Sequence, residues 1–284
     1  MRIAALTVRF LLLPLAIASG AAWGAENCSA NAKRVNDSNG LLLLGGTAQG
    51  PVKQVVMGEF GKDVNRQRRI LGEFDRCGSL LRADISMDKN EGDVVLKMAQ
   101  NITRIASGWQ AIYEMSVFAR QKGELVEVHN KQGIINYLTG KAGTITSSSE
   151  TFLLQGEKGF TETTNSYDDR QRLIKSVARG SDAQANGEYH YQWNAKDQLI
   201  ASSSAESEMK WRYDDKNREK GLYTRTHNPN SELTVLDECQ LWDEHDNCTL
   251  NYSHEREVFA QGEVVRNISA AWRFEYWDTP QGEK

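Results

Sequence analysis

The chain contains little proline, little cysteine and little net charge. Its 284 residues include four Pro and four Cys, and 34 Lys and Arg stand against 38 Asp and Glu, a formal net charge of −4. This composition excludes collagen-like, low-complexity and disulfide-dense proteins. It also gives no electrostatic reason to expect nucleic acid or an anionic membrane as a partner. What remains is an ordinary globular protein with 39% hydrophobic residues.

The chain also lacks a long apolar run. Phe10–Ala18 has nine residues, whereas a transmembrane helix needs about 20. This run follows two arginines and precedes the small residues of Ala22–Gly24, which is the pattern of a secretory signal peptide. We therefore expect residues 1–24 to be cleaved and residues 25–284 to reach the periplasm or the extracellular space.

An even number of cysteines in an oxidising compartment predicts two disulfides, for which three connectivities are open. The four residues are Cys28, Cys77, Cys239 and Cys248. The last two flank a turn-like stretch and could face each other across a hairpin, which would leave the first two to tether the mature N-terminus. The alternative is a metal site that adds His245 and His254, but the spacing contains no CxxC or HxxxH element. We expect structural disulfides and no metal.

An aromatic residue followed by Asp or Asn recurs along the chain. The copies are Phe74–Leu80, Tyr167–Leu173, Trp193–Leu199, Tyr213–Arg218, Trp242–Asp246 and a degenerate His129–Ile135. Asp or Asn at a turn start can accept a bond from the backbone two residues on. The residue three positions later is of a type that tolerates a left-handed backbone in five copies: Gly78, Gly133, Asp197, Asn217 and Asp246. In the remaining copy it is Gln171, which is less suitable.

Alternating apolar residues between these turns predict half-buried strands, as in Trp109–Val117 and Trp272–Tyr276. The prediction is an all-β fold: a curved antiparallel sheet, built as a meander of hairpins, in a single domain over residues 25–284. Leu41–Leu44 is expected to be a strand. One short helix is allowed at Val94–Ile105, whose spacing fits a helix or a strand equally well.

The turns resemble YD repeats of the RHS type, which build curling sheets of hairpins. More closely, the chain resembles the YnfC family of small enterobacterial envelope lipoproteins, which has no known activity. This resemblance rests on Gly50–Lys53, Cys77, Met209–Asp215 and Cys239–Cys248. It implies an envelope location and a fold, without a reaction. That family carries a lipidated Cys that this chain lacks, so membrane anchoring is not implied.

Motifs for common chemistries are missing. The sequence contains no GxSxG, no HExxH and no phosphate-binding loop. Its adjacent carboxylates, such as Asp168–Asp169 and Asp214–Asp215, lie at turn starts, where capping explains the first member. We therefore predict no catalytic residue, no metal and no cofactor, and we expect a binding or scaffolding protein rather than an enzyme.

Aromatic residues that share one strand face are the feature with a functional interpretation. They are Tyr189, Tyr191, Trp193, Trp211 and Tyr213. On the concave side of a curved sheet they could face a ligand, such as a lipid tail, a glycan or a strand of an envelope protein. The alternative is that they form the core beneath the sheet. Two other functions stay open: a secreted hydrolase of envelope glycan or lipid, and a periplasmic immunity or adaptor protein that blocks a toxin through an exposed sheet edge.

Overall fold

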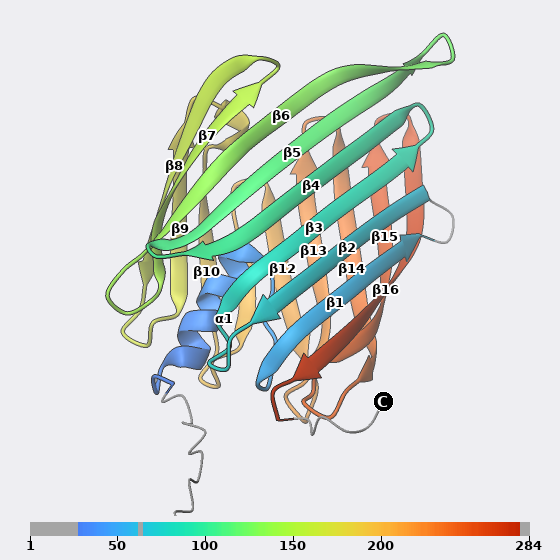
Figure 1. The fold of residues 1–284 in the computed structure, drawn as a ribbon. Helices are drawn as coiled ribbons and strands as arrows, with labels where there is room; N and C mark the ends of the chain where they lie inside the picture. The colour runs from blue at the N-terminus through green and yellow to red at the C-terminus, as the bar shows by residue number, and fades with distance from the viewer. Residues whose placement is uncertain (1–27, 62–64, 279–284) are drawn as a thin grey trace, which may run out of the picture.

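The protein folds into strands throughout, apart from one N-terminal helix (Figure 1). The structure is a computed structural model that describes residues 28–61 and 65–278; the predicted signal peptide, residues 1–24, lies outside them. The elements are α1 (Ala32–Leu43), β1 (Val52–Gly61), β2 (Asn65–Phe74), β3 (Leu80–Glu91), β4 (Val94–Ile105), β5 (Gly108–Gln121), β6 (Glu124–Thr139), β7 (Ile145–Leu154), β8 (Glu157–Tyr167), β9 (Leu173–Gly180), the 3-10 turn η1 (Ala183–Ala185), β10 (Gly187–Trp193), β11 (Leu199–Ser203), β12 (Ser207–Tyr213), β13 (Glu219–Asn228), β14 (Ser231–Trp242), β15 (Cys248–Phe259) and β16 (Gly262–Tyr276).

The sheet closes on itself. Every strand pairs antiparallel with its neighbours in sequence, and β1 pairs with β16, with Met57 opposite Trp272. The predicted all-β meander is confirmed, and its curvature continues to a closed barrel of sixteen strands. Closure leaves no free strand edge among the described residues. A toxin could therefore not pair with an exposed edge of this sheet, as the immunity or adaptor hypothesis requires.

The buried core occupies only one half of the barrel. Helix α1 lies inside the barrel (Figure 1), against the inner face of β1 to β7. The core consists of Leu43, Met57, Ile70, Leu80, Ala83, Ile85, Ile102, Trp109, Ala111, Tyr137, Ile145 and Ala270. Only Ala270 of this set lies on strands β10 to β16.

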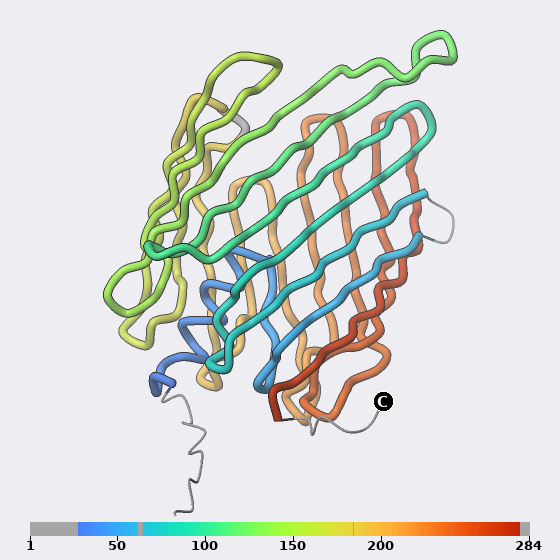
Figure 2. The backbone as a smooth tube through the Cα atoms, in the orientation of Figure 1, coloured from blue at the N-terminus to red at the C-terminus, as the bar shows by residue number. Residues whose placement is uncertain are grey.

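Five turns at the α1 end of the barrel share one geometry (Figure 2). In the first, the Asp75 carboxylate accepts hydrogen bonds from the backbone N–H of Cys77 (3.0 Å) and Ser79 (2.9 Å). The same pair of bonds occurs at Asp168, Asn194, Asp214 and Asp243. The fourth residue of each turn has a positive φ: Gly78, Gln171, Asp197, Asn217 and Asp246. The predicted hairpin turn is confirmed at these five positions, including the glutamine.

At Val94–Ile105, where the spacing left a helix and a strand equally open, the chain forms strand β4, and the short helix lies at Ala32–Leu43. Two local predictions are wrong. Leu41–Leu44 lies at the end of that helix and is not a strand. The degenerate turn His129–Ile135 lies inside β6. Gly133 is needed there because a Cβ would come within 2.7 Å of the Thr151 carbonyl oxygen.

Polar side chains of α1 bind the backbone of the turns. Ser38, which is fully buried, accepts a bond from the Leu173 N–H (3.0 Å) and donates to the Gln171 carbonyl (3.1 Å). Asn39 does the same for the Ile145 N–H (3.0 Å) and the Gly143 carbonyl (2.9 Å). These bonds satisfy buried backbone groups that a turn cannot pair by itself. They explain a helix whose sequence is rich in Asn, Asp and Ser.

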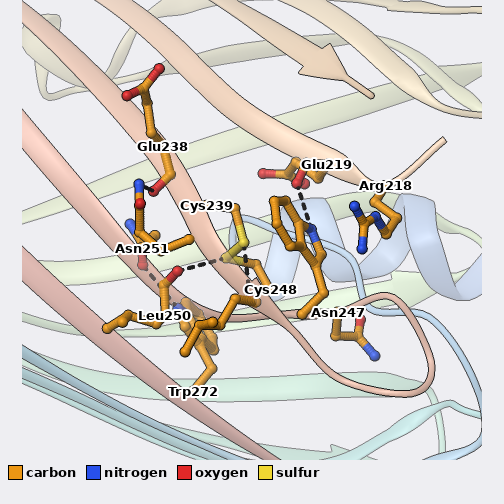
Figure 3. The surroundings of a disulfide bond; sticks show 12 residues. Arg218, Glu219, Glu238, Cys239, Asn247, Cys248, Leu250, Asn251 and Trp272 are labelled. Carbon is orange, nitrogen blue, oxygen red and sulfur yellow. Dashed lines mark hydrogen bonds between the residues drawn. A yellow bond between two sulfur atoms is a disulfide. The ribbon is translucent and has the colours of Figure 1, made fainter. Parts of the chain in front are cut away.

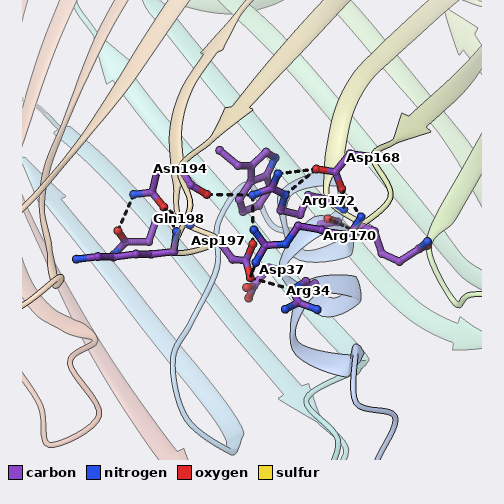
Figure 4. Close-up of polar contacts among 12 residues, drawn as sticks. Arg34, Asp37, Asp168, Arg170, Arg172, Asn194, Asp197 and Gln198 are labelled. Atoms are coloured by element: carbon purple, nitrogen blue, oxygen red, sulfur yellow. Dashed lines mark hydrogen bonds and ion pairs between the residues drawn. The ribbon is translucent and has the colours of Figure 1, made fainter.

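Ion pairs add a second attachment for the helix (Figure 4). Arg34 on α1 donates to Asp197 (2.8 Å), which also pairs with Arg170 (2.6 Å) and Arg172 (3.2 Å). Desolvation alone would raise the pKa of Asp197, but the bond from Arg34 and the nearby arginines hold it below its ordinary value. An ion pair between Arg34 and Asp197 thus attaches α1 to the turn between β10 and β11.

The disulfides are Cys28–Cys77 and Cys239–Cys248, the pairing expected across a hairpin and to the N-terminus. Cys28 precedes α1, and Cys77 lies in the first turn, so this bond joins the helix to the barrel. The second bond joins the neighbouring strands β14 and β15 (Figure 3). Because the sulfurs bond each other, the alternative metal site has lost its thiolate ligands.

We expect Asp168→Ala to lower the free energy of unfolding by about 1–2 kcal/mol, because two backbone N–H groups and Arg172 lose an ionised partner. These bonds lower the pKa of Asp168 against the opposing effect of desolvation. The stabilisation is therefore present above the ordinary value of 3.8 and is lost as the pH falls through the lower folded value. Urea unfolding at several pH values measures it.

The matched control is the neighbouring Asp169→Ala, an exposed turn residue, which should change the unfolding free energy by less than about 0.5 kcal/mol. Equal effects of the two substitutions at pH 7 would show that side-chain capping does not stabilise these turns.

Candidate functional site

The five aromatic residues singled out from the sequence lie on the inner face of β10 and β12. Directly paired residues point to the same side of a sheet, so a row of pairs can be followed from the core around the barrel. One such row, on the same face as the core residue Ala270, is Ile268, Ser253, Asp237, Leu222 and Trp211. Alternation then places Tyr189, Tyr191, Trp193 and Tyr213 on the lumen side as well. We call these five residues the aromatic wall.

Two members of the aromatic wall hold neighbouring strands together. The Trp193 indole N–H donates to the Leu173 carbonyl (2.7 Å), and the Tyr213 hydroxyl donates to the Leu199 carbonyl (2.8 Å). Each carbonyl belongs to the first residue of the strand that leaves the preceding turn. The aromatic residue of one turn therefore locks the exit of the turn before it, which accounts for its recurrence in the motif.

Of the other three, Tyr191 forms a side-chain hydrogen bond with Ser176 on the neighbouring strand β9. Tyr189 is 44% exposed, and Tyr191 and Trp211 are half-buried. None of the five belongs to the main cluster of buried apolar residues. Other residues therefore form the main buried core, and these five do not.

Glu219 breaks the pattern of the turns. The residue that follows each turn and faces inward is buried and aliphatic at Leu80, Leu173 and Leu199. In the fourth turn the same place is taken by Glu219, which is paired with Tyr213. Its carbonyl accepts the Trp242 indole N–H (3.0 Å), as the leucine carbonyls do for Trp193 and Tyr213. Glu219 thus occupies the same backbone position as Leu173 and Leu199, and its side chain lies on the same face of the sheet.

Glu219 is an exposed residue of the barrel wall. Desolvation, followed by the negative charge of Asp237, raises its pKa to about 7. Desolvation likewise raises the pKa of Asp237, which bonds Ser253. Neither carboxylate forms an ion pair within residues 28–61 and 65–278. Both acids thus lie near the aromatic wall. Asp237 was noted in the sequence only as part of the adjacent carboxylate pair Asp237–Glu238, and Glu219 was missed.

A separate charged network lies further along the lumen. Arg266 contacts Glu91, Glu257 (2.9 Å) and Glu255 (3.8 Å), and Arg66 pairs with Glu255 (2.8 Å). The Arg266 side chain is only 4% exposed. Each of these acids has an arginine partner, and the charges of Glu255 and Arg66 also act on Asp237.

The outer surface carries charge at several levels of the strands. Arg225 pairs with Glu232 (2.7 Å) and Arg82 with Glu73 (2.7 Å), all on outward-facing positions. A lipid-facing barrel would lose about 2–4 kcal/mol for each Arg or Lys at the bilayer midplane. A shallow groove of about 940 Å³ also lies on the outer wall of β1 to β6, over residues such as Val56, Ala99 and Ile112. It is on the opposite face of the sheet from the lumen.

Other candidate groups are used structurally. The leading carboxylates of three adjacent acid pairs, Asp168, Asp214 and Asp243, cap turns. Asp237 and Glu238 face opposite sides of β14. Within the described part of the chain, no group of three His, Cys, Asp or Glu residues is placed to hold a metal. Among those same residues, no helix is both long and apolar enough to cross a membrane.

Comparisons with known proteins find a similar fold. No family model matches the chain, and no curated protein matches it. A solved structure that does match is a porin-like protein from Bacteroides uniformis ATCC 8492, with 10% sequence identity and a TM-score of 0.50. The match covers 80% of this chain and 99% of that chain. The chain has a porin-like fold; the resemblance to the YnfC family and to YD repeats stays a prediction.

Proposed function

We propose that this chain is an exported, non-enzymatic binding protein of the cell envelope, whose lumen takes a ligand with an apolar body against the aromatic wall. The observation that carries the proposal is the placement of Tyr189, Tyr191 and Trp211 on the lumen face, partly exposed and outside the buried core. Binding sites of this kind are concave and lined by aromatic residues with a few polar groups.

The predicted signal peptide and the two disulfides, which persist in oxidising environments, support an envelope location. The charged outer wall supports a binding barrel in water over a channel in lipid, because the exposed Arg69 faces outward near the middle of β2, where lipid would lie. The predicted hydrolase would need two carboxyls facing across a cleft, and the turn carboxylates are engaged as caps. A binding role requires only the aromatic wall and no catalytic pair of carboxyls.

The test is binding of N-phenyl-1-naphthylamine, a neutral apolar probe whose fluorescence rises in apolar surroundings, to the mature protein. We expect saturable binding, and an affinity about 10-fold weaker for Tyr189→Ser combined with Trp211→Ala. Loss of two aromatic contacts of about 0.5–1.5 kcal/mol each gives a change of this size.

The matched control is Tyr252→Ser on the outer wall, which is 52% exposed where Tyr189 is 44% exposed. It should leave the affinity unchanged. Equal losses in the lumenal and outer variants, or no saturable binding by the unchanged protein, would contradict the proposal.

A further inference from the structure

Three methionines form one row across the inner face of the barrel. Met87 on β3 is paired with Met98 on β4, which is paired in turn with Met115 on the next strand, β5 (Figure 1). Alternation places them on the same face as the core residues Ile85 and Ile102. The whole chain has six methionines, so half of them occupy three successive places in a single register row.

The register brings the three thioether groups within reach of one another. Directly paired side chains have Cβ atoms about 4.5–5.5 Å apart, and the two outer strands of the three lie about 10 Å apart. A methionine side chain has three rotatable bonds. Rotation about them allows the sulfurs of Met87 and Met115 to meet that of Met98 from either side.

The row lies at the border of the buried core. None of the three residues belongs to the main cluster of buried residues, although Met98 packs against it. All three are half-buried, whereas Met57, which does belong to that cluster, is only 2% exposed. Gap filling in a core accounts for a methionine such as Met57. It does not account for three neighbouring thioethers that remain partly open to the lumen.

The residues that flank the row are cations with acids beside them. Arg68, at the β2 end, is directly opposite Glu59, whose charge acts on it. Lys131, at the β6 end, forms ion pairs with Asp182 (3.2 Å) and Glu150 (3.4 Å). Between these charges the row offers neutral sulfur donors.

Neutral thioethers are soft ligands, which bind soft metal ions in preference to hard ions such as Ca²⁺ and Mg²⁺. They also favour a monovalent ion, because the cost of taking an ion out of water grows with its charge. A thiolate would offset part of the charge of Zn²⁺, and a thioether does not. All four cysteines of the chain are joined in disulfides, so no thiolate competes for a soft ion.

We propose that Met87, Met98 and Met115 form a lumenal site for one soft monovalent metal ion, Cu(I) or its redox-inert analogue Ag(I). The prediction of no metal from the sequence concerned cysteine and histidine ligands, and it does not cover thioethers. The site lies on β3 to β5 and does not depend on the ligand proposed for the aromatic wall.

The experiment is calorimetric titration of the mature protein, with its disulfides intact, with Ag(I) in a chloride-free buffer. We expect saturable binding of one Ag(I) per chain. Met98→Leu removes the central sulfur and nearly conserves the side-chain volume. It should weaken binding by about 10-fold or more, since loss of even an outer-shell partner of a metal typically costs about 10-fold. Its thermal unfolding should stay close to that of the unchanged protein, so a weaker affinity does not report misfolding.

The matched control is Met209→Leu, the same substitution at a half-buried methionine on the inner face of β12. The residues paired with Met209 are Ser202 and Thr224, so it has no second thioether opposite it. This variant should leave the affinity for Ag(I) unchanged, as should His129→Gln, which removes an imidazole on β6. A loss in either control equal to that in Met98→Leu, or no saturable binding by the unchanged protein, would overturn the site.

The methionine methyl groups give an independent readout by nuclear magnetic resonance. With the first equivalent of Ag(I), the signals of Met87, Met98 and Met115 should shift together, while those of Met57 and Met209 stay in place. Zn²⁺ at the same concentration should shift none of them. Equal shifts at every methionine would show adventitious binding only and would overturn the proposal. Binding of the naphthylamine probe is measured separately, so the metal site and the aromatic wall can fail independently.

Discussion

Arg266→Met is expected to lower the free energy of unfolding by about 3–5 kcal/mol at pH 7, the usual cost of removing one partner from a buried ion pair. Arg266 is 4% exposed and is the shared cation of Glu91, Glu255 and Glu257. Methionine fills a similar volume, so the loss reports charge rather than packing. Chemical denaturation measures it.

The effect should depend on pH. Desolvation raises the pKa of Glu91, but Arg266 and Lys89 together hold it below its ordinary value. The stabilisation from this pair is therefore present above the ordinary value of 4.5 and is lost as the pH falls through the lower folded value. The difference between the variant and the unchanged protein should shrink below pH 4.5.

The control is Arg256→Met, which breaks an outer pair with Glu263 (2.5 Å) whose side chains are 55% and 50% exposed. Exposed pairs contribute about 0–1 kcal/mol. If both substitutions cost the same, Arg266 is not the centre of a buried network.

Much of the fold can be predicted from short-range signals. The hairpin turns follow from an Asp or Asn that caps its own backbone, and the strands follow from alternation, as at Trp211 and Tyr213. Closure cannot be predicted this way, because it depends on the pairing of β1 with β16, far apart in the chain. The helix was not predicted because its sequence includes residues of low helix propensity, such as Ser38 and Asn39. Their side chains bind the backbone of the turns.

The candidate site was half visible in the sequence. The aromatic residues could be identified because alternation marks one strand face, but their partners could not. Asp237 and Glu238 are indistinguishable neighbours until the register places one in the lumen and the other outside. Glu219 was detectable in principle: aligning the turn copies shows Glu where Leu80, Leu173 and Leu199 stand. The turn motif itself places no requirement on the residue at position 219, so the motif did not point to it.

Removing the Cys28–Cys77 disulfide with Cys28→Ser and Cys77→Ser is expected to lower the free energy of unfolding by about 4 kcal/mol. The bond closes a loop with a sequence separation of 49, and in the chain-entropy model a loop of that length contributes about this amount. It also joins α1 to the first turn, where the Asn36 side chain donates to the Cys77 carbonyl (2.7 Å). The double variant should therefore loosen the helix as well as the whole barrel.

Hydrogen exchange separates these two effects. The N–H groups of Ile145 and Leu173 are bonded by Asn39 and Ser38 of α1, so their exchange should accelerate more than that of strand N–H groups away from the helix. The control is Cys239→Ser with Cys248→Ser, whose sequence separation of 9 gives a smaller loss, somewhat under about 3 kcal/mol. This control should leave exchange at Ile145 and Leu173 in step with the rest of the barrel. Selective acceleration in the control, or none in the first variant, would mean that the helix is held by its polar contacts alone.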